Sequence, residues 1–340
     1  MTAAFGSTSP VVEFWPKAAL WCLLWIACDG HAEWQTRQQS SMGTEVSVTL
    51  WAKAPERGAQ GFAAVFAELH RIDQTYSPYI ETSALSALNR EASQAPQPVS
   101  DEMFFLLERA AYFSELTEGA FDITFASLGW YYDYRKRVQP SRSETERLLP
   151  AINYKSVVLD AEAQTVRFAH KNIRIDLGGI AKGYAVDRAA SVLRELGFTD
   201  ATVSAGGDSR ILGDKRGKPW LIGIKHPRPA IADATETVLT LPLTDTALST
   251  SGDYERYFID ANGQRVHHIL NPRTGRPTEG IMSVTVLGAL GVDTDALSTS
   301  GFVKGVDEGL ALINALDGFD AVVITTDGRV HYSAGLGEPR

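Results

Sequence analysis

Cysteine is scarce in this chain of 340 residues. The only two, Cys22 and Cys28, both lie near the N-terminus. Everything after residue 28 therefore lacks a thiol, which excludes an internal disulfide from the body of the protein. The same absence excludes a thiol nucleophile and a zinc site built on cysteine.

Excess positive charge is also missing. The chain has 41 acidic and 32 basic residues, for a net charge of −9. This balance argues against a general nucleic-acid-binding protein, which needs a positive surface to attract phosphates. Apolar residues make up 44% of the chain, enough to bury a sizeable core.

The uncharged run near the N-terminus, residues 18–27, is too short to span a bilayer and fits the apolar core of a signal peptide. We therefore expect residues 1–32 to be a leader and residues 33–340 to form one domain outside the cytoplasm. Two forms of processing stay open. Small residues at Gly30 and Ala32 favour release of a soluble periplasmic protein that begins at Glu33. Alternatively, a loose lipobox ending at Cys28 predicts a lipid anchor in the inner membrane, although Trp25 fits that motif poorly.

Hydrophobic periodicity predicts a mixture of hairpins and helices. Alternating residues predict strands at 42–50, 201–204, 221–225 and 283–287, whereas helical spacing predicts helices at 62–72, 83–89, 101–117 and 293–304. Asn262-Gly263 marks one hairpin, and residues 321–332 form a terminal one. This order favours an α+β fold over a doubly wound parallel sheet.

The stretch 174–183 (RIDLGGIAKG) is the most informative part of the body. Residues 173–176 look like the end of a strand, Gly178 and Gly179 allow a tight turn, and a helix follows that ends at Gly197. A carboxylate, a bare backbone and a helix N-terminus then meet at one point, which suits a phosphate or a metal–phosphate pair. Taken alone, such a turn is more often purely structural.

Two further patterns carry polar chemistry. Asp295 and Thr299 are four residues apart on a predicted helix and so share one face, which we expect to be on the surface. Their oxygens suit Mg²⁺ rather than zinc, although a solvated helix face is the ordinary alternative. His268 lies at a strand end before the Asn271-Pro272 turn and is a candidate base; a core or surface imidazole is equally compatible. His267 should point to the other face of the strand.

Several segments, in this order along the chain, resemble the ApbE-like FAD:protein FMN transferases, formerly called thiamine-biosynthesis lipoproteins. The matching segments are residues 41–44, Tyr79 with 83–89, 119–124, 176–184, 206–208, 251–254, 268–275 and 295–299. Each is weak alone, but all of them in order are highly specific. Asn271 replaces an aspartate that many members have, and Ser298 replaces an alanine.

The resemblance implies T-fold-like sheets packed with helices, and a reaction. FAD is cleaved at its pyrophosphate, FMN passes to a threonine or serine hydroxyl of an acceptor protein, and AMP leaves. The acceptor is expected to be a subunit of a membrane redox complex. Two alternatives remain: a Mg²⁺-dependent FAD pyrophosphatase that yields FMN and AMP, and a periplasmic FAD-binding protein without turnover.

The resemblance also implies roles for individual residues. Mg²⁺ would be held by the Gly179 carbonyl and the side chains of Asp295 and Thr299. His268 would be the base, with an ordinary pKa near ~6.5; Asp253 or metal activation alone would replace it if that role fails. The expected FAD contacts are Met42, Tyr79, Ala120, Phe121, Asp122, Asp176, Lys182 and Ile269.

Overall fold

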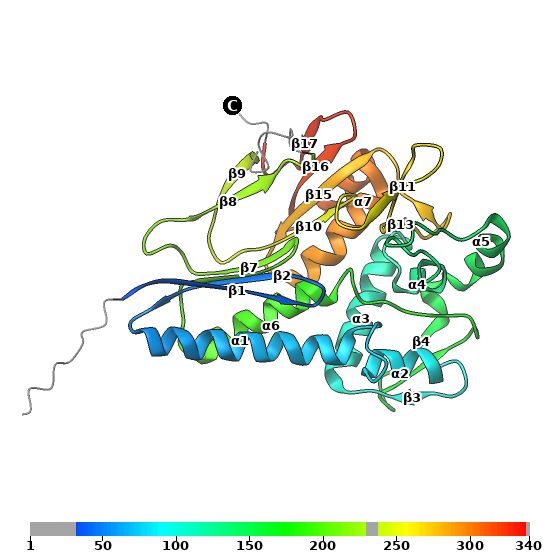
Figure 1. The fold of residues 1–340 in the computed structure, drawn as a ribbon, viewed down its shortest axis with the longest axis horizontal. Coiled ribbons are helices and arrows are strands. Elements are labelled where there is room, and N and C mark those ends of the chain that lie inside the picture. Colours follow the sequence, from blue (N-terminus) through cyan, green and yellow to red (C-terminus); the bar gives the residue numbers. More distant parts are fainter. Residues whose placement is uncertain (1–31, 229–236, 338–340) are drawn as a thin grey trace, which may run out of the picture.

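The computed structural model of the protein describes residues 32–228 and 237–337, so the predicted leader up to residue 31, with Cys28, lies outside the described residues. An eight-stranded sheet runs through the molecule (Figure 1). Every neighbouring pair in it is antiparallel. Its strands, in spatial order, are β1 (Glu33–Ser41), β2 (Thr44–Ala52), β6 (Ala201–Ala205), β7 (Asp208–Leu212), β10 (Ala247–Gly252), β15 (Ile281–Gly288), β16 (Asp320–Thr325) and β17 (Val330–Tyr332).

Three helices cover one face of this sheet: α1 (Pro55–Tyr76), α6 (Ala181–Glu195) and α7 (Gly291–Asn314). The alternation in β2 explains the contact, because Val46, Val48 and Leu50 point to one face and are fully buried. The apolar positions of α1 recur every three or four residues and meet them in the main core. Helices packed on antiparallel strands confirm the α+β class.

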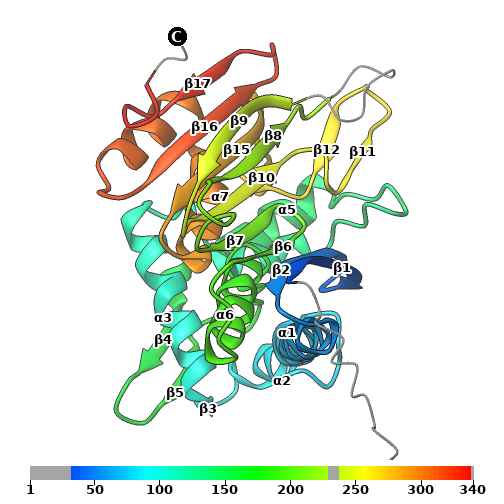
Figure 2. The ribbon, with the colours of Figure 1, turned by 90° about the vertical axis from the view of Figure 1, so that its left-hand side faces the viewer.

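A hairpin covers the opposite face of the sheet. It consists of β8 (Trp220–Lys225) and β9 (Thr237–Leu243), and Figure 2 shows it on the other side of the strands from α1 and α6. A second core fills this side, contributed in part by Ile211, Leu248 and Val322. Strand β15 is consequently buried along its whole length, because both of its faces are covered.

A smaller layer lies beside the ends of α1 and α7. A three-stranded sheet packs there with two helices, of 8 and 16 residues, each of which begins after a serine N-cap, Ser83 or Ser100. Its elements and the neighbouring ones are α2 (Ala84–Glu91), α3 (Asp101–Leu116), β3 (Gln97–Pro98), β4 (Val157–Asp160), β5 (Thr165–Phe168), α4 (Ala126–Gly129), α5 (Arg142–Leu148), β11 (Tyr257–Ile259), β12 (Arg265–His267), β13 (Leu270–Asn271), β14 (Arg276–Pro277) and the 3-10 turns η1 (Ile123–Phe125), η2 (Leu149–Ala151) and η3 (Tyr154–Ser156).

Three local expectations need correction or refinement. Residues 173–176 are extended but form no strand. Strand β1 was not expected, because its polar sequence gives no apolar alternation. The predicted end of a helix at Lys304 is confirmed inside the longer α7, since Gly305 has a non-helical φ of 82° and ψ of −170°. In the described part of the chain, no helix combines the length and apolar character that crossing a bilayer requires.

Candidate active site

Helices α6 and α7 cross with their backbones in contact. A Cβ on Gly183 would collide with the Gly291 carbonyl, and one on Gly291 would collide with the Gly183 carbonyl. The two glycines therefore permit an approach that no side chain allows. At this crossing the Gly183 N–H donates to Asp295 Oδ2 (3.0 Å), which fixes the carboxylate against the first turn of α6.

A charge cluster forms around this carboxylate, with two buried carboxyl groups and one half-buried ammonium. Lys182 Nζ lies 2.7 Å from Asp208 Oδ2 and 3.8 Å from Asp295 Oδ1. Burial acts to lower the pKa of Lys182, but the two carboxylates outweigh it and raise the pKa, so the ammonium stays charged. Burial, and then the neighbouring Asp208 carboxylate, raise the pKa of Asp295 above its ordinary value. The cluster has one ammonium for two carboxyl groups.

The three residues expected to hold Mg²⁺ come from two segments that the fold brings together. A Cβ on Gly179 would lie 3.2 Å from Thr299 Oγ1, so the turn and the helix are nearly in contact. Thr299 Oγ1 also lies 3.2 Å from Ser251 Oγ of β10. Because the Gly183 N–H is engaged by Asp295, the Gly179 carbonyl has no hydrogen-bond donor among the described residues.

The oxygen donors present fit Mg²⁺ bound together with a phosphate. One carboxylate, one hydroxyl and one carbonyl are hard ligands, and Mg²⁺ ordinarily completes its shell with water and substrate phosphates. Within residues 32–228 and 237–337, no group of three or more His, Cys, Asp or Glu side chains is arranged to hold a metal by itself. The expectation that Asp295 lies on an exposed helix surface is wrong: it is 2% exposed, because the start of α7 is covered by α6 and the sheet.

The segment 173–177, which forms no strand, is held by side chains instead of a neighbouring strand. The Asn89 amide both accepts from the Ile175 N–H (2.8 Å) and donates to the Ile175 carbonyl (2.9 Å). Such a pairing satisfies the backbone as a strand would, which explains why alternation here suggested a strand. Asp176 is anchored too, because its N–H donates to the Ile123 carbonyl (3.0 Å).

The turn itself uses most of its own donors. The Gly178 N–H donates to Asp176 Oδ1 (2.7 Å), and the Ala181 N–H donates to the Leu177 carbonyl (2.7 Å). With Gly183 also engaged, the backbone cradle predicted for a phosphate is largely occupied by protein groups. The positive groups near this turn that can attract a phosphate are the Lys182 ammonium and the Arg256 guanidinium, both of which act on the Asp176 carboxylate.

The loop that carries Ala120, Phe121 and Asp122 lies against the same turn. A Cβ on Gly179 would lie 3.3 Å from the Phe121 ring. Asp122 is buried, and its carboxylate accepts from the Thr124 N–H (2.8 Å), the Thr124 hydroxyl (2.6 Å) and the Tyr154 N–H (2.9 Å). Burial raises the pKa of Asp122 despite these bonds. The carboxylate of Asp122 therefore holds the loop in shape.

Two more expected FAD contacts lie near one arginine. Met42 and Gly43 form the two-residue turn between β1 and β2, with φ of 52° and 71°. Arg256 Nη2 lies 3.6 Å from the position that a Cβ on Gly43 would take. Desolvation of the Tyr79 hydroxyl, and then Asp176, raise the pKa of this side chain although most of its ring is exposed, whereas Arg256 opposes that rise. The Tyr79 hydroxyl is thus turned toward Asp176 and Arg256.

The two adjacent histidines have different environments. The His268 N–H donates to the Arg256 carbonyl (3.1 Å), and its Nδ1 is buried without a partner among the described residues. Burial, and then Arg256, lower the pKa of His268 to about 3, so the assumed pKa near ~6.5 is wrong. His267 Nε2 lies 2.8 Å from the Thr278 carbonyl, and its Nδ1 accepts from the Ile269 N–H (3.3 Å). His267 is therefore a buried anchor for the segment that carries His268 and Ile269.

A sequence model of the ApbE family matches residues 42–323. The chain belongs to the ApbE family. An FAD:protein FMN transferase of Treponema pallidum is 32% identical over 95% of this chain and 94% of its own length. One of Vibrio cholerae is 30% identical over 96% of this chain and 98% of its own length.

Solved structures of ApbE proteins share the fold. The ApbE protein of Thermotoga maritima is 34% identical, with a TM-score of 0.82 over 89% of this chain and 98% of that one. The flavin transferase ApbE of Vibrio cholerae gives a TM-score of 0.79 at 28% identity, over the same shares of the two chains. A histidine-to-glycine mutant of the latter has also been solved.

Sequence reasoning missed three polar residues of this ApbE-family site. Asp208 follows the Gly206-Gly207 turn, and Ser251 begins the 251–254 segment; both stand inside segments that carried the resemblance, but neither was given a role. Arg256 lies just after such a segment. Only the packing of β7, β10 and the following loop around α6 and α7 brings these side chains to the site.

Proposed function

We propose that this ApbE-family chain is an FAD:protein FMN transferase that uses Mg²⁺ and modifies a threonine or serine hydroxyl of an acceptor protein. The observation that carries the proposal is the contact of the half-buried Lys182 with the buried carboxylates of Asp208 and Asp295, beside Gly179 and Thr299. It joins a fixed ammonium to hard oxygen donors at one backbone turn, which suits a pyrophosphate and its metal. The relatives named FAD:protein FMN transferases, at about 30% identity over most of the chain, support the same activity.

The reaction is a phosphoryl transfer. The acceptor oxygen attacks the phosphorus on the FMN side, the bond from that phosphorus to the bridging oxygen breaks, and the bridging oxygen leaves with AMP. Mg²⁺, when bound by Gly179, Asp295 and Thr299, would neutralise phosphate charge. Lys182 supplies a positive charge that is already fixed before the substrate arrives, so little reorganisation is needed as charge develops.

His268 is the proposed acceptor of the hydroxyl proton. Its lowered pKa keeps the imidazole neutral at physiological pH, and its Nδ1 has no partner among the described residues. Because Nδ1 is buried, the other ring nitrogen, Nε2, is the one that would receive the proton as the new bond to phosphorus forms. Because His268 is a weak base, it takes the proton only in the transition state, when the attacking hydroxyl has become more acidic.

The acceptor is proposed to be a periplasmic subunit of a membrane redox complex. The support is the uncharged run at residues 18–27, which fits a secretion signal, together with Cys28 as a possible lipid site. A flavinylating enzyme on that side of the membrane needs an acceptor that is exposed there.

The test is incubation of the purified chain with FAD, Mg²⁺ and a candidate acceptor, followed by in-gel flavin fluorescence and an AMP assay. Fluorescent acceptor with equimolar AMP supports the transferase. AMP with free FMN and an unlabelled acceptor would instead identify an FAD pyrophosphatase. Flavin binding without AMP would indicate an FAD-binding protein without turnover.

A further inference from the structure

Three planar side chains from separate segments stack at the edge of the candidate site. The Tyr79 and Trp130 rings have centroids 5.5 Å apart and planes 19° apart. The Arg174 guanidinium carbon lies 3.9 Å from the centroid of the same Trp130 ring. The contacts therefore run from Arg174 to Trp130 and from Trp130 to Tyr79. Tyr79 is 66% exposed and Trp130 40% exposed, unusually open for such large rings.

The loop that carries Tyr79 is fixed by two serine hydroxyls of the next helix. Ser83 Oγ donates to the Ser77 carbonyl (2.7 Å), and Ser86 Oγ donates to the Pro78 carbonyl (3.3 Å). Both carbonyls immediately precede Tyr79 in the chain. The backbone position of this tyrosine is therefore set before any ligand binds.

The two inner members of the stack share an anchor. Trp130 closes α4, and its N–H donates to the Ala126 carbonyl (3.1 Å). Ser127, on the same short helix, accepts from the Arg174 N–H (3.0 Å). Arg174 is also two residues before Asp176, whose backbone is tied to the Ile123 carbonyl. The segment that carries Arg174 thus also carries Asp176 and leads into the turn at Gly178 and Gly179.

We infer that Trp130 and Arg174 are positioning residues that hold the ring of Tyr79, already an expected FAD contact, in place before FAD binds. This inference rests on the proposed function. One face of the Tyr79 ring is covered by Trp130, and the side chain is 66% exposed, so its opposite face is open for stacking. A ring fixed in this way loses little conformational freedom when it binds a second aromatic ring.

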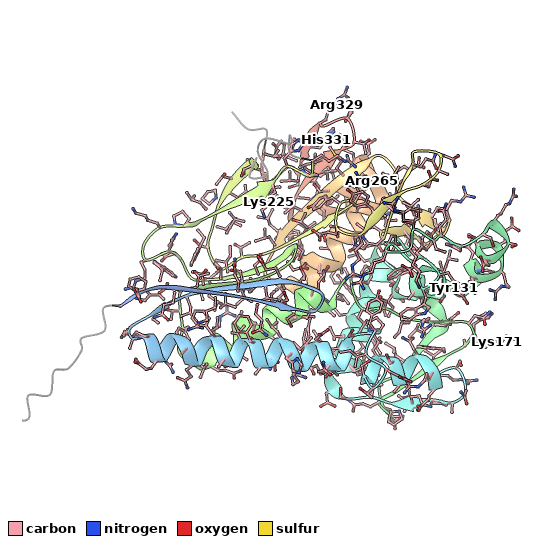
Figure 3. All side chains as sticks on the ribbon, viewed as in Figure 1. Tyr131, Lys171, Lys225, Arg265, Arg329 and His331 are labelled. Atoms are coloured by element: carbon pink, nitrogen blue, oxygen red, sulfur yellow. The ribbon has the colours of Figure 1, made fainter. Side chains whose placement is uncertain are left out.

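Trp130→Ala removes the support and should raise the Kd for FAD by roughly 3- to 10-fold, the range expected for one lost aromatic contact. The KM for FAD should rise by the same factor, with a smaller change in kcat. Tyr131→Ala is the matched control, because Tyr131 is adjacent in the chain and equally exposed at 41% but lies outside the stack (labelled in Figure 3). Trp130→Phe keeps a ring against Tyr79 and should restore most of the FAD affinity. If Trp130→Ala and Trp130→Phe have the same melting temperature, a difference in their FAD affinity cannot come from a loss of folding.

Binding of FMN and of AMP, measured separately, identifies the ring. Trp130→Ala weakens FMN binding alone if the isoalloxazine stacks there, and AMP binding alone if the adenine does. Unchanged FAD, FMN and AMP affinities in Trp130→Ala would overturn the inference while leaving flavin transfer by the unaltered chain intact. If the unaltered chain bound neither FAD nor FMN, the proposed function would fail together with this inference.

Discussion

The effect of replacing Asp295 depends on the residues that surround its carboxylate. A carboxylate on an exposed helix turn is easily replaced, but this one is buried, accepts from the Gly183 N–H and faces Lys182. Its removal therefore changes a hydrogen bond and a charge at once. A variant that separates these effects is needed to assign its function.

Asp295→Asn keeps the shape and an oxygen that can accept from Gly183, but removes the charge. Flavin transfer should fall by about 10²- to 10³-fold, since a carboxylate ligand and an electrostatic partner are lost together. The measurement is the rate of acceptor labelling at several Mg²⁺ concentrations. Asp307→Asn, on an exposed turn of the same α7, is the control and should leave the rate unchanged. Full activity of Asp295→Asn without excess Mg²⁺ would remove this residue from the proposed metal site.

His268 gives a second prediction at this scale. His268→Ala should keep FAD affinity and lose about 10²-fold in single-turnover flavin transfer, toward the lower end for general bases because its basicity is weak. The loss should be constant between about pH 5 and pH 8, since a pKa of about 3 leaves the ring neutral throughout. If His268→Ala transferred flavin at nearly the rate of the unaltered chain, His268 would not be the base, and Asp253 or metal activation alone would have to activate the hydroxyl.

The same pKa has a consequence for stability. The folded-state pKa lies below the ordinary value near ~6.5, so the unfolded state binds more protons between these two values. The stability that neutral His268 contributes is present above about pH 6.5 and is lost as pH falls toward about 3. The free energy of unfolding of His268→Ala should therefore fall less steeply over this range than that of the unaltered chain. His267, whose pKa burial also lowers, acts in the same direction and keeps the slope from vanishing.

Regular helices and strands were predictable from the sequence, but the side chains that hold the irregular segments in place were not. Apolar alternation and helical spacing located β2, β15 and most helices, because burial on one face leaves a period in the sequence. Residues 173–176 show the same alternation, but their backbone is satisfied by Asn89, a distant side chain that no local pattern reveals. Strand β1 has no such period and was missed for that reason.

The crossing of α6 and α7 yields a prediction about packing. Gly183→Ala should destabilise the fold by about 3 kcal/mol or more, because its methyl group would meet the rigid Gly291 carbonyl. Gly301→Ala, also in a helix, is the matched control, since its methyl group would meet only a Val284 side chain at 3.2 Å. Chemical denaturation of both variants measures the difference. Equal stability of the two would contradict the backbone contact described here.

Across the whole molecule, the candidate site is assembled from segments far apart in the chain. Met42, Tyr79, Phe121, Gly179 and Asp295 lie on different elements, and spacing alone gives no reason to group them. The family resemblance grouped these residues. The packing of α6 against α7 explains why Gly179 and Asp295 belong to one site. Arg256 and Trp130 lie outside the matched segments, so the resemblance did not group them with the site.

The maturation of the chain is a prediction about the molecule as a whole. Protein isolated from its native host should lie outside the cytoplasm and begin at Glu33, or at Cys28 carrying lipid. Intact mass and N-terminal sequencing distinguish the two, because lipidation adds mass and blocks the terminus. A cytoplasmic chain that retains Met1 would rule out both forms.

The polar edge strand β1 should also open locally more often than the central strands of the sheet. It packs through Trp34, whose ring lies 5.2 Å from that of Trp51 and 4.8 Å from that of Trp220, but most of the strand beyond is exposed. Little apolar area opposes local opening at the end that carries Met42, so its amides should exchange hydrogen with solvent much faster than those of β15. Saturating FAD should slow exchange near Met42 and leave the Trp34 end unchanged. Hydrogen–deuterium exchange with and without FAD would reveal this difference, because it resolves a motion confined to half of one strand.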